Sequence, residues 1–223
     1  MTEITEHLRD IVERVARASS RAPRATGVTI VAVSKQKTIA DIAEAFRAGQ
    51  HDFGESYAQE AAQKIEALRD LDITWHFIGA LQTNKTRIVA ENFQWVHTID
   101  RAKIAVRLNE QRPHFAPPLN VLIQVNQARE PQKHGVFEDD ILPLAREIAA
   151  LPRLKLRGLM TIPPASGDPT HWFRELAATL ERVRSAGFDV DTLSMGMSAD
   201  FEQAIAAGSN CVRIGTAIFG ARA

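Results

Sequence analysis

The stretch Val28-Thr29-Ile30-Val31-Ala32-Val33-Ser34-Lys35 decides the fold of this chain. A continuous run of apolar and small residues of this kind is typical of a strand that is buried on both faces. A helical segment follows at residues 38–48, with Thr38 as its expected N-cap and Gly49 just past its end. A buried strand that leads directly into a helix is the repeating unit of parallel sheets.

The same unit recurs along the rest of the sequence, which predicts eight strands, each followed by a helix. Eight such units in a chain of this size favour a closed (β/α)8 TIM barrel of the α/β class. The alternative is an open doubly wound sheet, which usually has fewer strands and a glycine-rich first turn. The predicted strands cover residues 28–34, 51–54, 73–78, 93–99, 119–125, 154–162, 190–193 and 211–214. The predicted helices cover residues 38–48, 56–68, 83–91, 101–109, 138–150, 169–185, 199–207 and a turn after Gly215.

An amphipathic helix is predicted for residues 1–20, ahead of the first strand, because apolar residues recur there at helical spacing. Residues 21–27, which include a proline and a glycine, are expected to break it. No linker or low-complexity segment divides the sequence. We therefore expect residues 1–223 to form a single domain, with the N-terminal helix packed on the barrel.

Composition excludes several classes of protein. The 223 residues include 27 Lys and Arg and 27 Asp and Glu, so the formal net charge is zero, whereas a general nucleic-acid binder needs a basic surface. The single cysteine, Cys211, allows neither an intramolecular disulfide nor a cysteine-based zinc site. The acidic N-terminus is unlike a signal or transit peptide, and no apolar run reaches bilayer length. These features predict a cytoplasmic protein with no membrane or nucleic-acid partner.

Lys35 is the first candidate for chemistry, because barrel active sites lie at the carboxyl ends of the strands. Its stem would lie in an apolar wall, where desolvation lowers the pKa of an amine and leaves more of the nucleophilic form that reacts with an aldehyde. The alternative, that Lys35 is simply a solvated residue at the end of a strand, stays open. Lys37, just beyond, is expected to be a surface lysine.

The last two strand ends resemble a phosphate site. Residues 193–198 and 213–216 each place small residues and hydroxyl groups before a helix start, where backbone N–H groups bind anions. The alternative is two ordinary capped turns. Arg213 lies inside the eighth strand, where a charge needs a partner or a ligand.

Other titratable residues give weaker signals. Glu55, at the end of the second strand, could orient a lysine or a ligand, or could simply sit at a helix N-terminus. The seven histidines show no metal-ligand spacing, and His76, inside a strand, is expected to have a structural role in the core. No metal site is predicted.

Several ordered motifs together resemble the pyridoxal phosphate homeostasis protein family, whose barrel is similar to the N-terminal domain of alanine racemase. The resemblance covers residues 28–222, nearly the whole chain. The motifs are VAVSK at 31–35, FGE at 53–55, WHFIG at 75–79, LQTNK at 81–85, RGLM at 157–160, LSMGMS at 193–198 and VRIGTAIFG at 212–220.

The resemblance implies that Lys35 carries pyridoxal 5′-phosphate (PLP) as a Schiff base. It also implies that the phosphate contacts Ser198, Gly215 and Thr216, and that Arg213 faces the pyridine nitrogen. We add Ser56, Met160 and Ser194 as further expected cofactor contacts. The sequence departs from the family pattern at Ser56, where asparagine is common, and at Ala80 and Ala199.

The implied function is intracellular PLP (vitamin B6) homeostasis, in which a non-catalytic carrier buffers PLP or delivers it to transient apo-enzyme partners. An arginine at the pyridine nitrogen disfavours protonation there, which suits a carrier better than a vigorous catalyst. One alternative is a racemase-like PLP enzyme, but such enzymes use a second-domain tyrosine, and Tyr57 is the only tyrosine here. Another is a Schiff-base aldolase or lyase barrel.

A complete barrel needs no partner, so we expect a monomer. Lys133 is expected to be an exposed loop lysine, although a second ligand there stays open.

Overall fold

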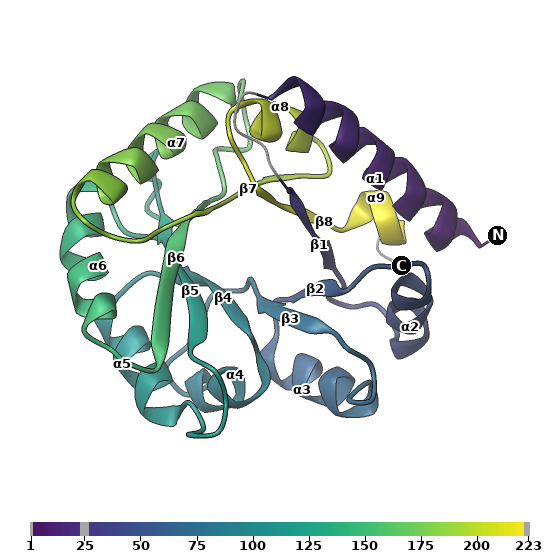
Figure 1. Cartoon of the computed structure of the whole chain (residues 1–223), viewed down its shortest axis with the longest axis horizontal. Coiled ribbons are helices and arrows are strands. Elements are labelled where there is room, and N and C mark those ends of the chain that lie inside the picture. The colour runs from purple at the N-terminus through teal and green to yellow at the C-terminus, as the bar shows by residue number, and fades with distance from the viewer. Residues whose placement is uncertain (1, 23–26, 221–223) are drawn as a thin grey trace.

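The computed structural model describes residues 2–22 and 27–220, and these form a closed barrel of eight parallel strands. The strands follow one another in chain order around the barrel, and β8 closes it against β1 (Figure 1). The (β/α)8 prediction is therefore confirmed, and the open doubly wound sheet is not formed. The strands are β1 (Thr29–Val33), β2 (Asp52–Glu55), β3 (Thr74–Phe77), β4 (Trp95–Ile99), β5 (Leu119–Val125), β6 (Leu154–Thr161), β7 (Thr192–Met197) and β8 (Cys211–Ile214).

Helices surround the barrel as an outer ring (Figure 1). Apolar side chains between this ring and the strands form the main core, in which Phe53, Phe77 and Phe173 are completely buried. The helices are α1 (Glu3–Arg21), α2 (Ile39–Arg47), α3 (Ala58–Ala67), α4 (Thr86–Asn92), α5 (Ala102–Gln111), α6 (Ile141–Ala149), α7 (Thr170–Ser185), α8 (Phe201–Ala206) and α9 (Thr216–Phe219), with a 3-10 turn at Glu138–Asp140.

The N-terminal helix packs on the barrel as predicted. Leu8, Ile11 and Val15 recur on one face of α1 and are buried against α8, α9 and α2. Arg14 forms a salt bridge with Glu202 on α8, with a nitrogen-to-oxygen distance of 3.1 Å. The helix ends at Arg21. The predicted break at residues 21–27 lies partly outside the described residues, because 23–26 are not described.

The prediction of the seventh strand needed correction. The seventh strand was predicted at residues 190–193, but β7 spans Thr192–Met197, so Ser194 lies in the strand and not in the following loop. The strand continues because the register between β7 and β8 shifts between Ser194 and Met197, where Gly196 adopts a φ of +95°. A Cβ at Gly196 would lie 2.6 Å from the Cβ of Ala204, so only glycine fits this bend.

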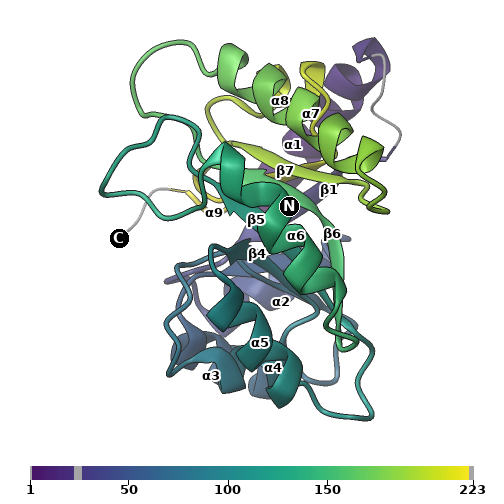
Figure 2. The same cartoon turned by 90° about the vertical axis from the view of Figure 1, so that its left-hand side faces the viewer.

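The carboxyl ends of the strands meet at one end of the barrel, which we call the mouth. Figure 2 shows the long loops after β5 and β6 projecting from the same side of the molecule as α9. Thr38 caps α2 as predicted, because its hydroxyl accepts a hydrogen bond from the Asp41 N–H while the Asp41 carboxylate accepts one from the Thr38 N–H. None of the described helices combines the length and the apolar character that crossing a bilayer requires.

Candidate functional site

Lys35 lies in a tight turn at the mouth, two residues beyond the end of β1. Its side chain is half-buried. The next residue, Gln36, has a φ of +62°, a left-handed conformation that is uncommon for residues other than glycine. This turn is therefore held in a defined shape by its surroundings.

A buried ion cluster of Lys64, Glu55 and Glu60 lies against this turn and supplies the hydrogen bonds that fix it. The Lys64 ammonium donates to the carboxylates of Glu55, at 2.8 Å, and Glu60, at 2.6 Å, and to the Ser34 carbonyl oxygen, at 2.8 Å. The Ser34 hydroxyl donates to Glu55 at 2.7 Å, and the Gln36 N–H donates to Glu60 at 2.7 Å. The residues on both sides of Lys35 are thus anchored to one cluster.

Glu55 is the carboxylate that the sequence singled out, and it does orient a lysine. That lysine is Lys64, on α3, which no motif in the sequence singles out. Glu55 is completely buried, and burial raises the pKa of its carboxyl above the ordinary value, against the opposing effects of Lys64 and Ser34. Its Oε2 atom has no hydrogen-bond partner among the described residues.

Arg213 points into the barrel interior from β8. It is only 4% exposed, and its Nη1 and Nη2 atoms donate to the Ser194 hydroxyl, at 2.7 Å, and to the Thr161 carbonyl oxygen, at 2.9 Å. Burial lowers the pKa of the guanidinium, although arginine remains charged. Met160 pairs with Ser194 across β6 and β7, so both predicted contacts lie on this interior face. Arg213 is therefore a buried cation whose two hydrogen-bond acceptors are neutral.

The loops after β7 and β8 lie next to each other, as the phosphate prediction requires. The Ser198 hydroxyl is 3.4 Å from the backbone N–H of Ala217, in the first turn of α9. Gly215 is the N-cap of that turn, and Thr216, its first residue, is exposed. A Cβ at Gly215 would lie 3.3 Å from the Cβ of Val33, so a small residue keeps β1 and this loop close together.

A cavity of about 230 Å³ opens at the mouth on the β3 to β6 side, and its lining includes Gln124, Asn126 and Lys133. Lys133 is half-buried and donates to the Pro163 carbonyl oxygen at 3.0 Å, so the prediction of an exposed loop lysine is wrong.

Ser56 lines a neighbouring cavity of about 360 Å³ together with Tyr57, whose side chain is 52% exposed. Ser56 therefore lies at the rim and not in the interior with Arg213.

Lys37 also differs from its prediction. The side chain is half-buried, and its ammonium donates to the carbonyl oxygen of Phe219, at 2.9 Å, at the end of α9. The residue was expected on the surface because a charged residue in a loop gives no sign of a distant acceptor. The contact ties the turn after β1 to the C-terminal segment.

Two of the seven histidines meet inside the barrel, although no spacing in the sequence pairs them. His76 is buried in the interior, as expected, and its Nδ1 atom lies 3.0 Å from the Nε2 atom of His97 on the next strand. A polar residue in the middle of each of two neighbouring buried strands is the signal that could have identified the pair.

Comparison with known proteins identifies the family of this chain. The family model described as "Alanine racemase, N-terminal domain" matches residues 7–223. The chain is 49% identical to the pyridoxal phosphate homeostasis protein of Escherichia coli, over 100% of this chain and 98% of that protein.

Two solved structures show the same fold. PipY of Synechococcus elongatus, solved with PLP bound, is 33% identical with a TM-score of 0.83, covering 94% of this chain and 100% of PipY. Alanine racemase from Corynebacterium glutamicum, at 18% identity and a TM-score of 0.70, is similar in fold, but the match covers 98% of this chain and only 61% of the racemase. On the family model and on the identity with its curated relatives, the chain belongs to the pyridoxal phosphate homeostasis protein family, which shares the barrel of the alanine racemase N-terminal domain.

Proposed function

We propose that this chain binds PLP at the barrel mouth and serves in PLP homeostasis, holding the cofactor for buffering or delivery. The observation that carries the proposal is Arg213, a buried cation inside the barrel whose described partners are both neutral. A buried charge of this kind calls for a further acceptor, and the pyridine nitrogen of PLP is one. The PLP-bound structure of the relative PipY supports the same assignment.

The residues at the mouth fit the chemical groups of this cofactor. The Lys35 amine is the proposed point of covalent attachment to the aldehyde, with loss of one water. The hydroxyl groups of Ser198 and Thr216 and the backbone at Gly215 would receive the phosphate. The cofactor supplies an aldehyde and an aromatic nitrogen; the protein supplies an amine, donors for the phosphate and a fixed cation.

Met160 and Ser194 are proposed to contribute to the cofactor site from the barrel interior. Ser194 holds the Arg213 guanidinium, and Met160 contributes an apolar surface beside it. Ser56, at the rim, is proposed as a peripheral contact on the β2 side.

A carrier role is favoured over catalysis by the same arginine. A guanidinium can only donate, so it leaves the pyridine nitrogen without a proton and weakens the ring as an electron sink. A racemase of this fold needs a second acid or base, and the only tyrosine, Tyr57, is largely exposed at the rim. We propose that the chain has no robust racemase activity.

We further propose that the chain acts in the cytoplasm as a monomer, as one domain, and passes PLP to apo-enzymes through transient contacts. Every strand of the barrel is paired on both sides, so the sheet needs no partner chain to complete it.

The test is to add PLP to the purified protein, record the visible spectrum, reduce with borohydride and map the modified lysine by peptide mass. We expect a new absorption band and a single adduct on Lys35, both absent in Lys35→Ala. Adducts scattered over surface lysines, or no band, would contradict PLP binding at this site. Alanine racemisation that depends on Lys35 would overturn the carrier role and leave PLP binding intact.

A further inference from the structure

Five side chains from five different strands form one hydrogen-bonded chain through the barrel interior. It runs from Arg213 to Ser194 (2.7 Å), from Ser194 to His97 (2.8 Å), from His97 to His76 (3.0 Å) and from His76 to Asp52 (2.9 Å). His76, His97, Ser194 and Arg213 are all at most 4% exposed. Only the last member, Asp52, has a partly exposed carboxylate.

The direction of donation along this chain follows from its two ends. Arginine can only donate, so the Ser194 oxygen accepts from Arg213, and the Ser194 proton remains available to be donated to His97 Nδ1. At the other end, the Asp52 carboxylate can only accept, so His76 Nε2 carries a proton. Each neutral imidazole has one donor and one acceptor nitrogen, and therefore His97 Nε2 donates to His76 Nδ1.

This is the one pattern in which every contact pairs a donor with an acceptor while both rings are neutral. Burial lowers the pKa of both histidines, and the neighbouring His76 and Arg213 lower that of His97 further, so the neutral state is favoured. In the opposite pattern, a bare His76 nitrogen would face the Asp52 carboxylate, so two acceptors would meet at 2.9 Å with no proton between them.

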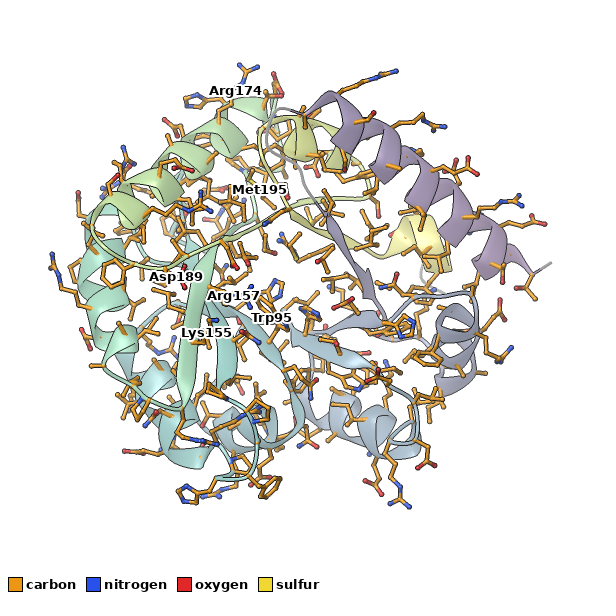
Figure 3. The ribbon with its side chains drawn as sticks, in the orientation of Figure 1. Trp95, Lys155, Arg157, Arg174, Asp189 and Met195 are labelled. Atoms are coloured by element: carbon orange, nitrogen blue, oxygen red, sulfur yellow. The ribbon has the colours of Figure 1, made fainter. Side chains whose placement is uncertain are left out.

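The far end of the chain is distant from the mouth. Asp52 is the first residue of β2 and lines a cavity of about 210 Å³ at the amino end of the barrel, together with Trp95, Arg157 and Asp191. Trp95 and Arg157 lie beside each other (Figure 3), and the guanidinium carbon of Arg157 lies 4.8 Å from the Trp95 ring centroid. Asp52 therefore acts on the mouth only through the chain.

We infer that Asp52, His76 and His97 are positioning residues that act through Ser194 to hold the Arg213 guanidinium in the orientation in which it meets the cofactor. The fixed donor direction points the Ser194 proton away from Arg213 and a lone pair of the Ser194 oxygen toward it, which favours the observed orientation of the guanidinium. This inference rests on the proposed function where it concerns PLP. The chain itself is a property of the protein without any ligand.

The first test needs no cofactor. Nitrogen-15 NMR of the ligand-free protein should show both buried histidines as neutral rings protonated at Nε2. A His97 ring protonated at Nδ1, or at both nitrogens, would overturn the inference whatever the protein binds.

The second test is a double-mutant cycle on PLP affinity in the full-length protein, with Asp52→Ala and Ser194→Ala. Each single variant should weaken PLP binding about tenfold, because a hydrogen bond to a charged group is lost or loosened. The double variant should be no weaker than Ser194→Ala alone, because the effect of Asp52 passes through Ser194. Additive effects, or unchanged affinity in Asp52→Ala, would overturn the inference.

Two controls separate positioning from general damage. Asp52→Asn keeps an acceptor oxygen and should restore nearly wild-type PLP affinity. His171→Asn, at an exposed site on α7, should change neither PLP affinity nor the signals of the buried rings. If Asp52→Ala fails to fold, the NMR result alone tests the inference. If wild-type protein binds no PLP, the proposed function is contradicted, and the NMR experiment still tests the direction of the hydrogen-bonded chain.

Discussion

The Lys64 ammonium lies 2.8 Å from the Ser34 carbonyl oxygen, so a lysine on α3 holds the backbone immediately before Lys35. The side chain of Lys64 is only 7% exposed, and two carboxylates accept from the same ammonium. The turn that presents Lys35 is thereby fixed by charge–dipole contacts and not by apolar packing alone. Its shape is coupled to the integrity of one buried ion cluster.

Lys64→Met should lower the free energy of unfolding by about 3 kcal/mol, because it leaves the Glu55 carboxylate buried without its cation. The variant should also weaken PLP binding, since the turn around Lys35 loses an anchor on Ser34. Urea denaturation and a PLP titration measure the two effects. Lys103→Met, at an exposed position on α5, is the matched control and should change both by little. Equal stability of the two variants would show that the cluster does not hold the turn.

The pH dependence of stability should carry the signature of Glu55. Burial is the largest influence on this carboxyl, and the net effect is a pKa above the ordinary value of 4.5. The folded protein then holds the Glu55 proton more tightly than the unfolded chain does. Stability contributed by the protonated group is therefore present at low pH and is lost as the pH rises from the unfolded pKa through the folded one.

Glu55→Gln removes this titration and keeps an acceptor oxygen for Lys64 and Ser34. As the pH rises above about 4.5, wild-type protein should lose stability relative to the Gln variant, and the difference should level off above the folded-state pKa. Urea denaturation of both proteins across this pH range provides the measurement. A wild-type protein that gains stability relative to the variant over this range would mean that Lys64 outweighs the burial of Glu55.

Gly158 is a position where the barrel has no room for a side chain. Its φ is +151°, and a Cβ there would lie 1.9 Å from the Thr192 carbonyl oxygen on the neighbouring strand. Gly158→Ala should cost more than about 4 kcal/mol of stability, since backbone cannot move aside as a flexible side chain can. Gly187→Ala is the control: φ is +95° there, but no atom lies within 4 Å, so only about 1–2 kcal/mol of backbone strain is expected.

Much of the fold could be predicted from the sequence, because it depends on local runs. The predicted bounds of β5 and β8 match the observed strands Leu119–Val125 and Cys211–Ile214, where an apolar run is enclosed by turn residues. The predicted seventh strand ended too early because Ser194 and Gly196, two residues apart, resemble a loop. Its continuation depends on Gly196 packing against Ala204 of α8, which no local pattern reveals.

Residues of the candidate site could be predicted where they lie at strand ends, but not where they depend on contacts between separate elements. Lys35 and Arg213 stand out because a charge beside or within an apolar run is unusual. Lys64 does not stand out, because a lysine in a helix usually lies on the surface, and its burial arises from contact with Ser34, which precedes it by 30 residues. The pairing of His76 with His97 likewise depends on the stagger between β3 and β4, which only the closed barrel defines.

Cys211 offers a probe of the same interior, since it lies two residues before Arg213 on β8 and is only 4% exposed. Burial raises the pKa of the thiol to about 11, outweighing the opposing influence of Arg213. At pH 8 only about 0.1% of such a thiol is in the reactive thiolate form, and a reagent must also reach a buried side chain at the inner wall of the amino-end cavity. Iodoacetamide should therefore leave the native protein unmodified over hours and add one label in denaturant, as mass spectrometry would show. Labelling that does occur in native buffer should track the opening of the barrel, and so should accelerate far more in Gly158→Ala than in Gly187→Ala. Rapid labelling of the folded wild type would mean that the interior is open to solvent, and with it the hydrogen-bonded chain that ends at Arg213.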